Sequence, residues 1–336
     1  MGNRQQIQQI PSSLRVTLEK ARGEYANTVR KVRWGEGPLF VCGAGNCSAL
    51  GMAASYPFEM FVGWPVVTRP AAVWQNYSLA LLHPRSILLV VAGQGESPEV
   101  QELIQSAHER RCTVLALTNN PEGTLAKLAD HVFLCHAEGD AESPGMAVGM
   151  YAALNFLAFE VMRVLKKPRP FWEQLAREFD ELPEKMDWVF TQLVGTLRSV
   201  GAEAARVPRL GIIGGGFFEY PAKHAAWRMR SPTSCPLEAF EPSDFLSASS
   251  AYVRRDDGVL LLSGSHSKLK KLLTRCAAQA RAHGARVLSL TDNNDRDLAE
   301  ASDLGLLLPP LLEAPASILA LFVLEWLAAE MPRKGS

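Results

Sequence analysis

The sequence has no excess of charge of either sign. Lysine and arginine together number 35, as do aspartate and glutamate, so the formal net charge of the 336 residues is zero. Domains that bind nucleic acid usually carry a basic surplus, and no polybasic cluster for an anionic membrane surface stands out. The composition therefore argues against nucleic acid and against a membrane surface as the main partner.

Segments typical of secretion, membrane insertion and disulfide scaffolds are also lacking. The chain begins with polar residues, Asn3 to Gln6, rather than the apolar core of a signal peptide. No uncharged apolar run reaches the roughly 18 residues of a membrane-spanning helix. Six cysteines are too few for a disulfide framework, and Cys42 and Cys47 lack the second ligand pair of a zinc site. We expect a cytoplasmic protein with reduced cysteines and no bound metal.

One glycine cluster invites comparison with dinucleotide-binding loops. Gly214, Gly215 and Gly216 follow an apolar run, but the later glycine of the dinucleotide fingerprint is missing and no suitable acidic residue follows a second predicted strand. We therefore expect no nicotinamide cofactor, and no other cofactor is indicated.

Short apolar runs alternate with helical segments along most of the chain. The predicted strands are 39–42, 65–68, 87–91, 113–117 and 131–135 in the first half, and 210–213, 259–262, 286–290 and 304–308 in the second. Strands that alternate with helices predict parallel sheets covered on both faces. The fold class is therefore α/β.

The two halves repeat one another. Gly43 and Gly214, like Gly93 and Gly264, stand 171 positions apart, whereas Thr118 and Thr291, like Asp130 and Asp303, stand 173 apart. Four landmarks that keep their offset within two residues indicate a duplicated unit. We expect a helical segment at 1–35, a first domain at 36–168, a helical connector at 169–207 that is interrupted at Pro183, and a second domain at 208–331.

The clearest candidate for a binding site follows the third predicted strand. Gly93 and Gly95 permit a sharp turn, Ser97 occupies the N-cap position of the next helix, and Pro98 occupies its first turn. Backbone N–H groups and the positive end of the helix dipole favour an anion at such a corner. The second half has the same corner at 263–267.

These motifs resemble the tandem sugar isomerase (SIS) family. The matching stretches are 41–50 (VCGAGNCSAL), 91–97 (VAGQGES), 117–121 (LTNNP), 220–221 (YP) and 236–240 (PLEAF). The resemblance implies two tandem SIS-type doubly wound domains, each a five-stranded parallel sheet flanked by helices, and a homodimer. It also implies that a phosphorylated sugar or amino sugar binds at the carboxyl ends of the strands.

The resemblance implies particular ligand-binding residues, with departures from the family pattern. They are Gly43, Gly45, Asn46, Ser48, Gly93, Gln94, Gly95 and Ser97 in the first half, and Ser263, Ser265 and Ser267 in the second. The family's hydroxyl-rich phosphate loop, Ser-x-Ser-Gly-x-Thr, has lost two of its three hydroxyls at 92–97. The loop at 263–267 retains hydroxyls, so we expect it to be the better anion site, with the loop at 93–97 as the alternative.

The family's catalytic positions are also changed. Its glutamate and histidine positions are occupied by Ser231 and Ser247, and with the sequence ending at 331–336 we expect the family's lysine-bearing catalytic tail to be short or absent. A serine without a neighbouring base cannot replace a carboxylate that cycles between protonation states.

Three other residues are candidates to replace the lost catalytic groups. Glu238 and Asp244 lie in a proline-broken segment that we expect to form a loop, and His224 lies on a predicted helix. A solvated loop and a histidine that only packs are the alternatives.

Two functions fit this pattern. One is an aldose–ketose isomerase or deglycase that acts on a phosphorylated sugar or sugar amine by proton transfer. The alternative is a catalytically inactive phosphosugar sensor or regulatory binding module, because function depends on the site and not on the fold.

Overall fold

The computed structural model describes residues 3–35, 37–140, 142–167, 169–230 and 235–331. The chain divides into two compact units. We call Ser12–Asp180 the N-terminal unit, and Glu181–Ser336 together with Met1–Pro11 the C-terminal unit.

The N-terminal unit is built on a parallel sheet of order β2-β1-β3-β4-β5. Its strands are β1 (Leu39–Gly43), β2 (Val66–Pro70), β3 (Ile87–Val91), β4 (Thr113–Thr118) and β5 (His131–Leu134). Every residue of β1 and β3 is buried, as expected for strands covered on both faces. All five strands were predicted from the sequence.

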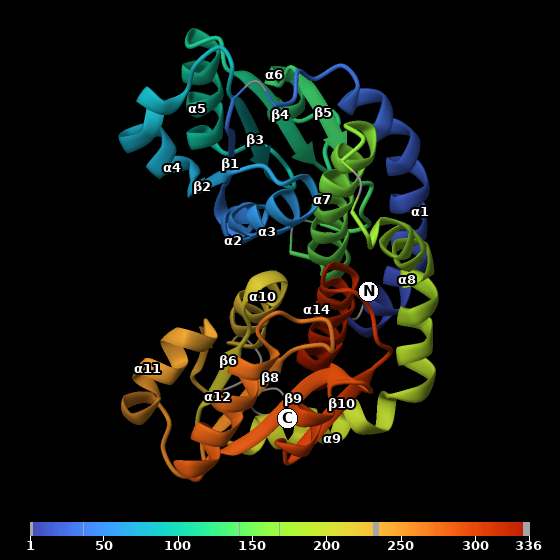
Figure 1. Ribbon diagram of the computed structural model, residues 1–336, viewed down its shortest axis with the longest axis vertical. Helices are drawn as coiled ribbons and strands as arrows, with labels where there is room; N and C mark the ends of the chain where they lie inside the picture. The colour runs from blue at the N-terminus through green and yellow to red at the C-terminus, as the bar shows by residue number, and fades with distance from the viewer. Residues whose placement is uncertain (1–2, 36, 141, 168, 231–234, 332–336) are drawn as a thin grey trace. The chain divides into compact units, whose positions relative to one another are not determined.

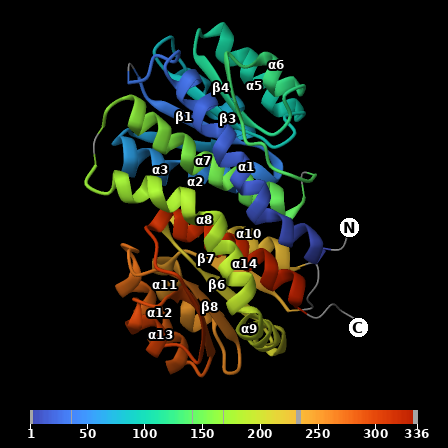
Figure 2. The same cartoon turned by 90° about the vertical axis from the view of Figure 1, so that its right-hand side faces the viewer.

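Helices cover both faces of this sheet (Figure 1). Helix α5 (Pro98–Glu109) contributes Val100, Leu103 and Ile104 to the core on one face. Helix α7 (Pro144–Val164) and residues 12–29 of α1 (Asn3–Val29) lie on the other face, and Figure 2 shows these two helices in front of the strands. The ring of Tyr25 on α1 packs edge-on against Phe133 of β5, with centroids 5.2 Å apart.

Helix α7 is long and apolar enough to cross a membrane by length and composition alone. However, 89% of its apolar window is buried inside the protein. Buried core helices meet the same criterion, so its apolar surface is accounted for by packing.

Short helical pieces complete the N-terminal unit. They are η1 (Gly45–Cys47), α2 (Ser48–Ala53), α3 (Ser55–Pro57), η2 (Phe58–Val62), α4 (Ala71–Val73), η3 (Trp74–Ser78), η4 (Leu79–Leu81) and α6 (Thr124–Leu128). Of these, η1 and α2 directly follow the carboxyl end of β1.

The C-terminal unit repeats this plan with sheet order β10-β9-β8-β6-β7. Its strands are β6 (Leu210–Ile213), β7 (Leu237–Phe240), β8 (Gly258–Leu262), β9 (Arg286–Asp292) and β10 (Leu304–Leu308). The structure therefore confirms two five-stranded parallel sheets flanked by helices.

The helices of the C-terminal unit also form two layers (Figure 1). They are α9 (Val194–Arg206), α10 (Glu219–Arg230) after the short η5 (Gly216–Phe218), α11 (Pro242–Tyr252), α12 (Lys270–Ala282), α13 (Arg296–Glu300) and α14 (Glu313–Glu330). Phe245 of α11 and Leu273 of α12 pack with Val259 and Leu261 on one face of the sheet. Helices α9, α10 and α14 cover the other face.

Two predictions about local structure are wrong. The segment that contains Glu238 and Asp244 is strand β7 followed by helix α11, not a loop, because Pro242 starts the helix instead of breaking it. Pro183 does not interrupt the connector, because helix α8 (Trp172–Gln192) runs through it. The connector breaks at Leu193 instead, where α9 begins.

The repeat is visible in matching hydrogen bonds. Asp130 accepts a hydrogen bond from the backbone N–H of Val114 at 2.7 Å, and Asp303 accepts one from Val287 at 2.8 Å. Each aspartate therefore holds the start of its β4-type strand at the same place in its own unit.

Candidate functional site

The loop Gly93–Ser97 leaves the carboxyl end of β3 and leads into α5. Gly95 has a φ of +72°, and a Cβ there would lie 2.6 Å from the Cβ of Leu125, so only glycine fits. Ser97 is the N-cap residue in extended conformation, Pro98 follows in the first turn, and the Ser97 hydroxyl bonds to Glu99. This geometry confirms the predicted strand, turn and helix N-terminus.

The N–H groups of this loop are open. Within the described part of the chain, no hydrogen bond runs from the backbone N–H groups of Gln94, Gly95, Glu96 or Ser97 to another group. Four unsatisfied donors next to a helix N-terminus form a place where an anion gains hydrogen bonds and a favourable dipole interaction.

The one carboxylate within the loop, Glu96, is held by a different element. It accepts hydrogen bonds from the backbone N–H and the hydroxyl of Thr124, at 2.9 and 2.7 Å, where α6 starts. The Thr124 hydroxyl, and then the Thr124 N–H, hold the pKa of Glu96 below its usual value. The Glu96 carboxylate therefore does not occupy the open donors of its own loop.

The first loop of the unit lies beside this corner. The Gly93 N–H interacts with the thiol of Cys47, whose pKa is raised by burial and partly lowered again by that N–H. A Cβ at Gly43 would lie 2.0 Å from the carbonyl oxygen of Cys47, so this glycine serves close backbone packing. Ser48 opens α2 and is half-buried, and the side chain of Asn46 lies outside the described part.

A cation missed by the sequence analysis lies at the same edge of the sheet. Arg69 of β2 pairs in register with Cys42 of β1, one position before the carboxyl end. Its guanidinium stacks over Trp74 at 5.7 Å, and within the described residues its buried Nε has no hydrogen-bond acceptor. Arg69 directly follows the predicted strand 65–68, and the sequence gave no signal that β2 continues through it to Pro70 and carries it to this edge.

The corresponding loop of the C-terminal unit is already occupied by carboxylates. The backbone N–H of Ser265 donates to Asp292 at 2.6 Å, and that of Lys268 donates to Glu313 at 3.0 Å. Ser267 also bonds to Glu313, and burial raises the pKa of this carboxyl. The protein's own acidic groups therefore fill the positions that a phosphate would take.

Two hydroxyl groups near the same loop are also bonded to a carboxylate of the protein. The Ser263 and Thr291 hydroxyls both bond to Asp295, each at 3.0 Å. Asp292, Asp295 and Glu313 are only 3%, 2% and 7% exposed. Three buried acidic side chains oppose a further anion, so these contacts argue against the serine-rich loop as the phosphate site.

Two sequence differences explain the contrast between the loops. Asn119 stands where the C-terminal unit has Asp292, and its amide bonds both backbone groups of Ala137, each at 2.8 Å. Phe217 and Phe218, both buried, stand where the N-terminal unit has Asn46 and Cys47. The N-terminal unit thus has no carboxylate at the position of Asp292 and no aromatic rings at the positions of Phe217 and Phe218.

His224 has a buried partner that the sequence did not identify. Its Nε2 lies 2.5 Å from Oε1 of Glu325, and Nε of Arg228 donates to Oε2 of the same carboxylate at 3.0 Å. Burial would raise the pKa of Glu325, but hydrogen bonds and charge from His224, with Arg228, outweigh it and lower this pKa. The cluster joins α10 to α14.

The other catalytic candidates are not brought together with His224. Glu238 is exposed on β7, and Asp244 is exposed in the first turn of α11. No contact links either of them to His224 in the described part of the chain. Ser247 lies on α11, where its hydroxyl donates to the carbonyl of Ser243 at 2.9 Å, whereas Ser231 lies outside the described residues.

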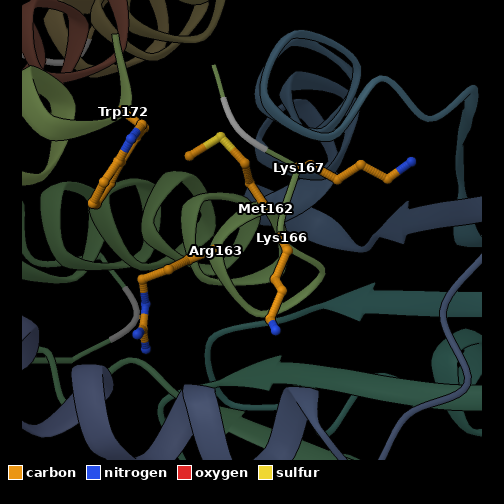
Figure 3. Close-up of a pocket in the computed structure, with 5 residues that line it drawn as sticks. All are labelled: Met162, Arg163, Lys166, Lys167 and Trp172. Carbon is orange, nitrogen blue, oxygen red and sulfur yellow. The ribbon is translucent and has the colours of Figure 1, made fainter. Parts of the chain in front are cut away.

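A separate hollow of about 280 Å³ lies at the end of α7, lined by Met162, Arg163, Lys166, Lys167 and Trp172. Figure 3 shows Lys167 extending to the side opposite Trp172. Arg163 is paired with the buried Glu160 at 2.6 Å. The cations do not converge, so this hollow lacks the features of an anion site.

Metal ligands are not grouped in the described residues. No cluster of three or more histidine, cysteine, aspartate or glutamate side chains there could hold a metal ion.

The duplicated sheets and the helix-capped loop define the class of a double α/β domain with its binding edge at the carboxyl ends of the strands. The family model of the SIS domain matches residues 35–160 and again 205–330. The chain belongs to the SIS domain family, as the sequence motifs predicted.

Relatives and solved structures agree with this assignment. The chain is 21% identical over 299 residues to the glutamine–fructose-6-phosphate aminotransferase (isomerizing) of Synechocystis, covering 86% of this chain and 47% of that protein. It thus spans about half the length of the curated aminotransferases that it matches. A stretch of 65 residues is 45% identical to the phosphoheptose isomerase of Aromatoleum aromaticum, which is 19% of this chain and 33% of that one.

Two solved structures show the same fold at low identity. The C-terminal domain of glucosamine-fructose-6-phosphate aminotransferase from Francisella tularensis matches with a TM-score of 0.82 and 15% identity over 97% of this chain and 95% of that one. A phosphosugar isomerase structure from Silicibacter pomeroyi matches with a TM-score of 0.77 and 20% identity over 98% and 96% of the two chains.

Proposed function

We propose that the N-terminal unit binds the phosphate group of a phosphorylated sugar or amino sugar at the loop Gly93–Ser97. The observation that carries this proposal is the contrast between the two copies. The N–H groups of Gln94 to Ser97 have no acceptor in the described chain, whereas those of Ser265 and Lys268 are taken by Asp292 and Glu313.

Backbone donors can replace the hydroxyls that the loop has lost. A hydrogen bond to a charged group contributes about 1.5–3 kcal/mol, and four open N–H groups exceed the two missing hydroxyls in number. The dipole of the 12-residue helix α5 adds favourable charge at its N-terminus. Gly43, Gly45, Asn46 and Ser48 of the neighbouring loop are proposed to contact the sugar.

The proposed chemistry is aldose–ketose isomerisation or deglycation by proton transfer. It is supported by isomerases among the relatives, including phosphoheptose isomerase and arabinose 5-phosphate isomerase. Glu238, Asp244 and His224 remain the proposed acid–base groups.

The second candidate function is a phosphosugar sensor without turnover. It is favoured by the engagement of His224 with buried Glu325 and by the absence of contacts among the three acid–base candidates within the described residues. Incubation with hexose and hexosamine 6-phosphates in deuterated water separates the two functions. Deuterium at C1 or C2 of the sugar supports the enzyme, whereas binding without exchange supports the sensor.

Substitution of Ser97 by aspartate tests the phosphate site. Aspartate is as good an N-cap as serine, so α5 should stay intact, while the new carboxylate repels a phosphate. In a thermal-shift screen with these sugar phosphates, the wild type at 100 times the dissociation constant should gain about 2.7 kcal/mol of stability. Ser97→Asp should lose this gain.

The matched control is Ser265→Ala in the C-terminal loop. It should leave the ligand-induced shift unchanged, because the N–H groups around it already bind carboxylates. If Ser265→Ala abolished the shift while Ser97→Asp kept it, the phosphate site would lie in the C-terminal unit. If no sugar phosphate shifted the wild type, the proposed function would be wrong.

We further propose that the protein is a cytoplasmic homodimer. The cysteines fit a reducing compartment, since none of the six, all of which lie in the described residues, forms a disulfide and four are buried. Exposed Met52, Tyr77 and Leu81 on the N-terminal unit offer apolar surface for a second copy. Light scattering after size-exclusion chromatography should give twice the chain mass of 36.8 kDa, and a mass of one chain would contradict the dimer.

A further inference from the structure

A second hollow opens at the amino edge of the sheet of the N-terminal unit. It has a volume of about 470 Å³ and is lined by Lys31, Arg33, His108, Arg111, Cys112, Thr113, Asp130 and His131. Thr113 and His131 are the first residues of β4 and β5. The hollow therefore lies at the end of the sheet opposite to the loop Gly93–Ser97, a strand length away.

The hollow is lined by cations without counterions. Lys31, Arg33 and Arg111 are exposed, and their side chains form no ion pair or hydrogen bond within the described part of the chain. Asp130, the one carboxylate among the lining residues, is engaged by the Val114 N–H at 2.7 Å and faces His108 at 3.6 Å. The positive charge of the three cations is thus left for a ligand.

The repeat supplies an internal comparison. At the same edge of the C-terminal unit, Arg281 pairs with Asp303 at 3.0 Å. Arg286 and Arg206 both approach Glu203, at 3.6 and 3.2 Å. Three arginines at this edge therefore have a carboxylate partner in the C-terminal unit, whereas Lys31, Arg33 and Arg111 have none within the described part of the N-terminal unit.

Arg111 adds an observation of a different kind. It has a φ of +57°, in the left-handed region that disfavours a residue with a Cβ. The residue 173 positions later is Gly284, with a φ of +77°. The N-terminal unit thus holds a long cationic side chain at a turn where the other copy uses glycine.

We propose that this hollow binds an anion with two or more adjacent phosphate groups, such as an inorganic or organic triphosphate. Each exposed cation interacts weakly with a single charge, so a ligand needs several charges to engage Lys31, Arg33 and Arg111 together. A hollow of this volume fits a compact ligand rather than an extended nucleic acid. The site is separate from the sugar-phosphate loop and does not depend on it.

Isothermal titration with inorganic tripolyphosphate at low ionic strength tests the proposal. The full chain should bind one equivalent, orthophosphate should bind at least tenfold more weakly, and added salt should weaken binding because the charges are exposed. Arg111→Gly should reduce the affinity about tenfold or more. Glycine suits the positive φ, so this variant should fold at least as well as the wild type.

Arg110→Ala is the matched control. It removes the same charge from the adjacent residue, which lies outside the hollow and donates to the carbonyl of Ser106 at 3.0 Å. The affinity of Arg110→Ala for tripolyphosphate should stay within twofold of the wild-type affinity, and so should the affinity of Ser97→Asp. The proposal is overturned if tripolyphosphate does not bind, or if Arg110→Ala weakens binding as much as Arg111→Gly. A loss confined to Ser97→Asp would assign the triphosphate to the sugar-phosphate loop instead.

Discussion

Glu325 shows how one buried carboxylate can organise two neighbouring side chains. Its side chain is 1% exposed, and both His224 and Arg228 of α10 bond to it across the contact with α14. Such a group is costly to bury unless it is paired. Its partners therefore act in the packing of these helices, whatever else His224 does.

Replacing Glu325 by glutamine should destabilise the protein. The variant leaves Arg228 without its counterion and removes the carboxylate that bonds to His224, and removing one partner of a buried ion pair costs about 3–5 kcal/mol. Urea unfolding at neutral pH measures the loss. Glu300→Gln, at an exposed position on α13, is the control and should change stability by no more than about 0.5 kcal/mol.

The same carboxylate predicts a pH dependence. Because its pKa is lower in the folded state, the stability it contributes is present above the unfolded pKa of about 4.3 and is lost as the pH falls through the folded value. The difference in unfolding free energy between wild type and Glu325→Gln should therefore shrink on acidification. A difference that stays constant between pH ~7 and pH ~3 would contradict this role.

Single residues also show how far the site could be predicted. Ser97 and Pro98 predicted the start of helix α5 correctly, because helix capping depends on residues that are neighbours in the sequence. The occupation of the other loop could not be foreseen, because Asp292 lies 27 positions after Ser265 and Glu313 lies 45 after Lys268. Its serines predicted an open anion site, whereas in the structure carboxylates that lie far away in the sequence accept the hydrogen bonds of its backbone N–H groups.

Helix α8 contains Pro183 in its interior, and the effect of this proline on the free energy of unfolding can be measured. A proline in a helix interior is about 3 kcal/mol less favourable than alanine. Pro183 is also buried, and trimming its ring removes about two methylene groups worth roughly 0.8 kcal/mol each. Pro183→Ala should therefore raise the unfolding free energy by about 1–2 kcal/mol.

Asp187→Ala is the control for this change. Asp187 lies on the same helix and is exposed, so its replacement should have little effect on urea unfolding. If Pro183→Ala lowered the stability instead, the packing of the proline ring would outweigh the missing backbone hydrogen bond.

Strand β7 is the strand that the sequence did not predict. Its four residues, Leu237–Phe240, include the exposed Glu238 and lie between Pro236 and Pro242. As the edge strand of its sheet, β7 pairs only with β6 and does not need the continuous apolar run of a central strand. The other strands carry such runs or occur at matching offsets, and they were found for that reason.

For the whole molecule, duplication was the most secure prediction because it used spacing instead of local propensity. The landmarks Asp130 and Asp303 hold equivalent strands by equivalent hydrogen bonds. What spacing cannot reveal is divergence between copies with the same backbone. The two units differ in charge at both the carboxyl and the amino ends of their strands. A few substitutions there decide which backbone N–H groups and which cationic side chains have a carboxylate partner.

Asp292 at the end of β9 and Glu313 at the start of α14 act as built-in ligands of the loop at 263–267, because they accept its backbone hydrogen bonds. Asp292 and Glu313 are covalently part of the chain, so this loop is saturated at every solute concentration. On the proposed function, the N-terminal loop depends on phosphosugar supply, since a ligand stabilises the folded state according to its concentration. Starvation for that metabolite would then lower the protease resistance of one half of the protein while the other half stays unchanged.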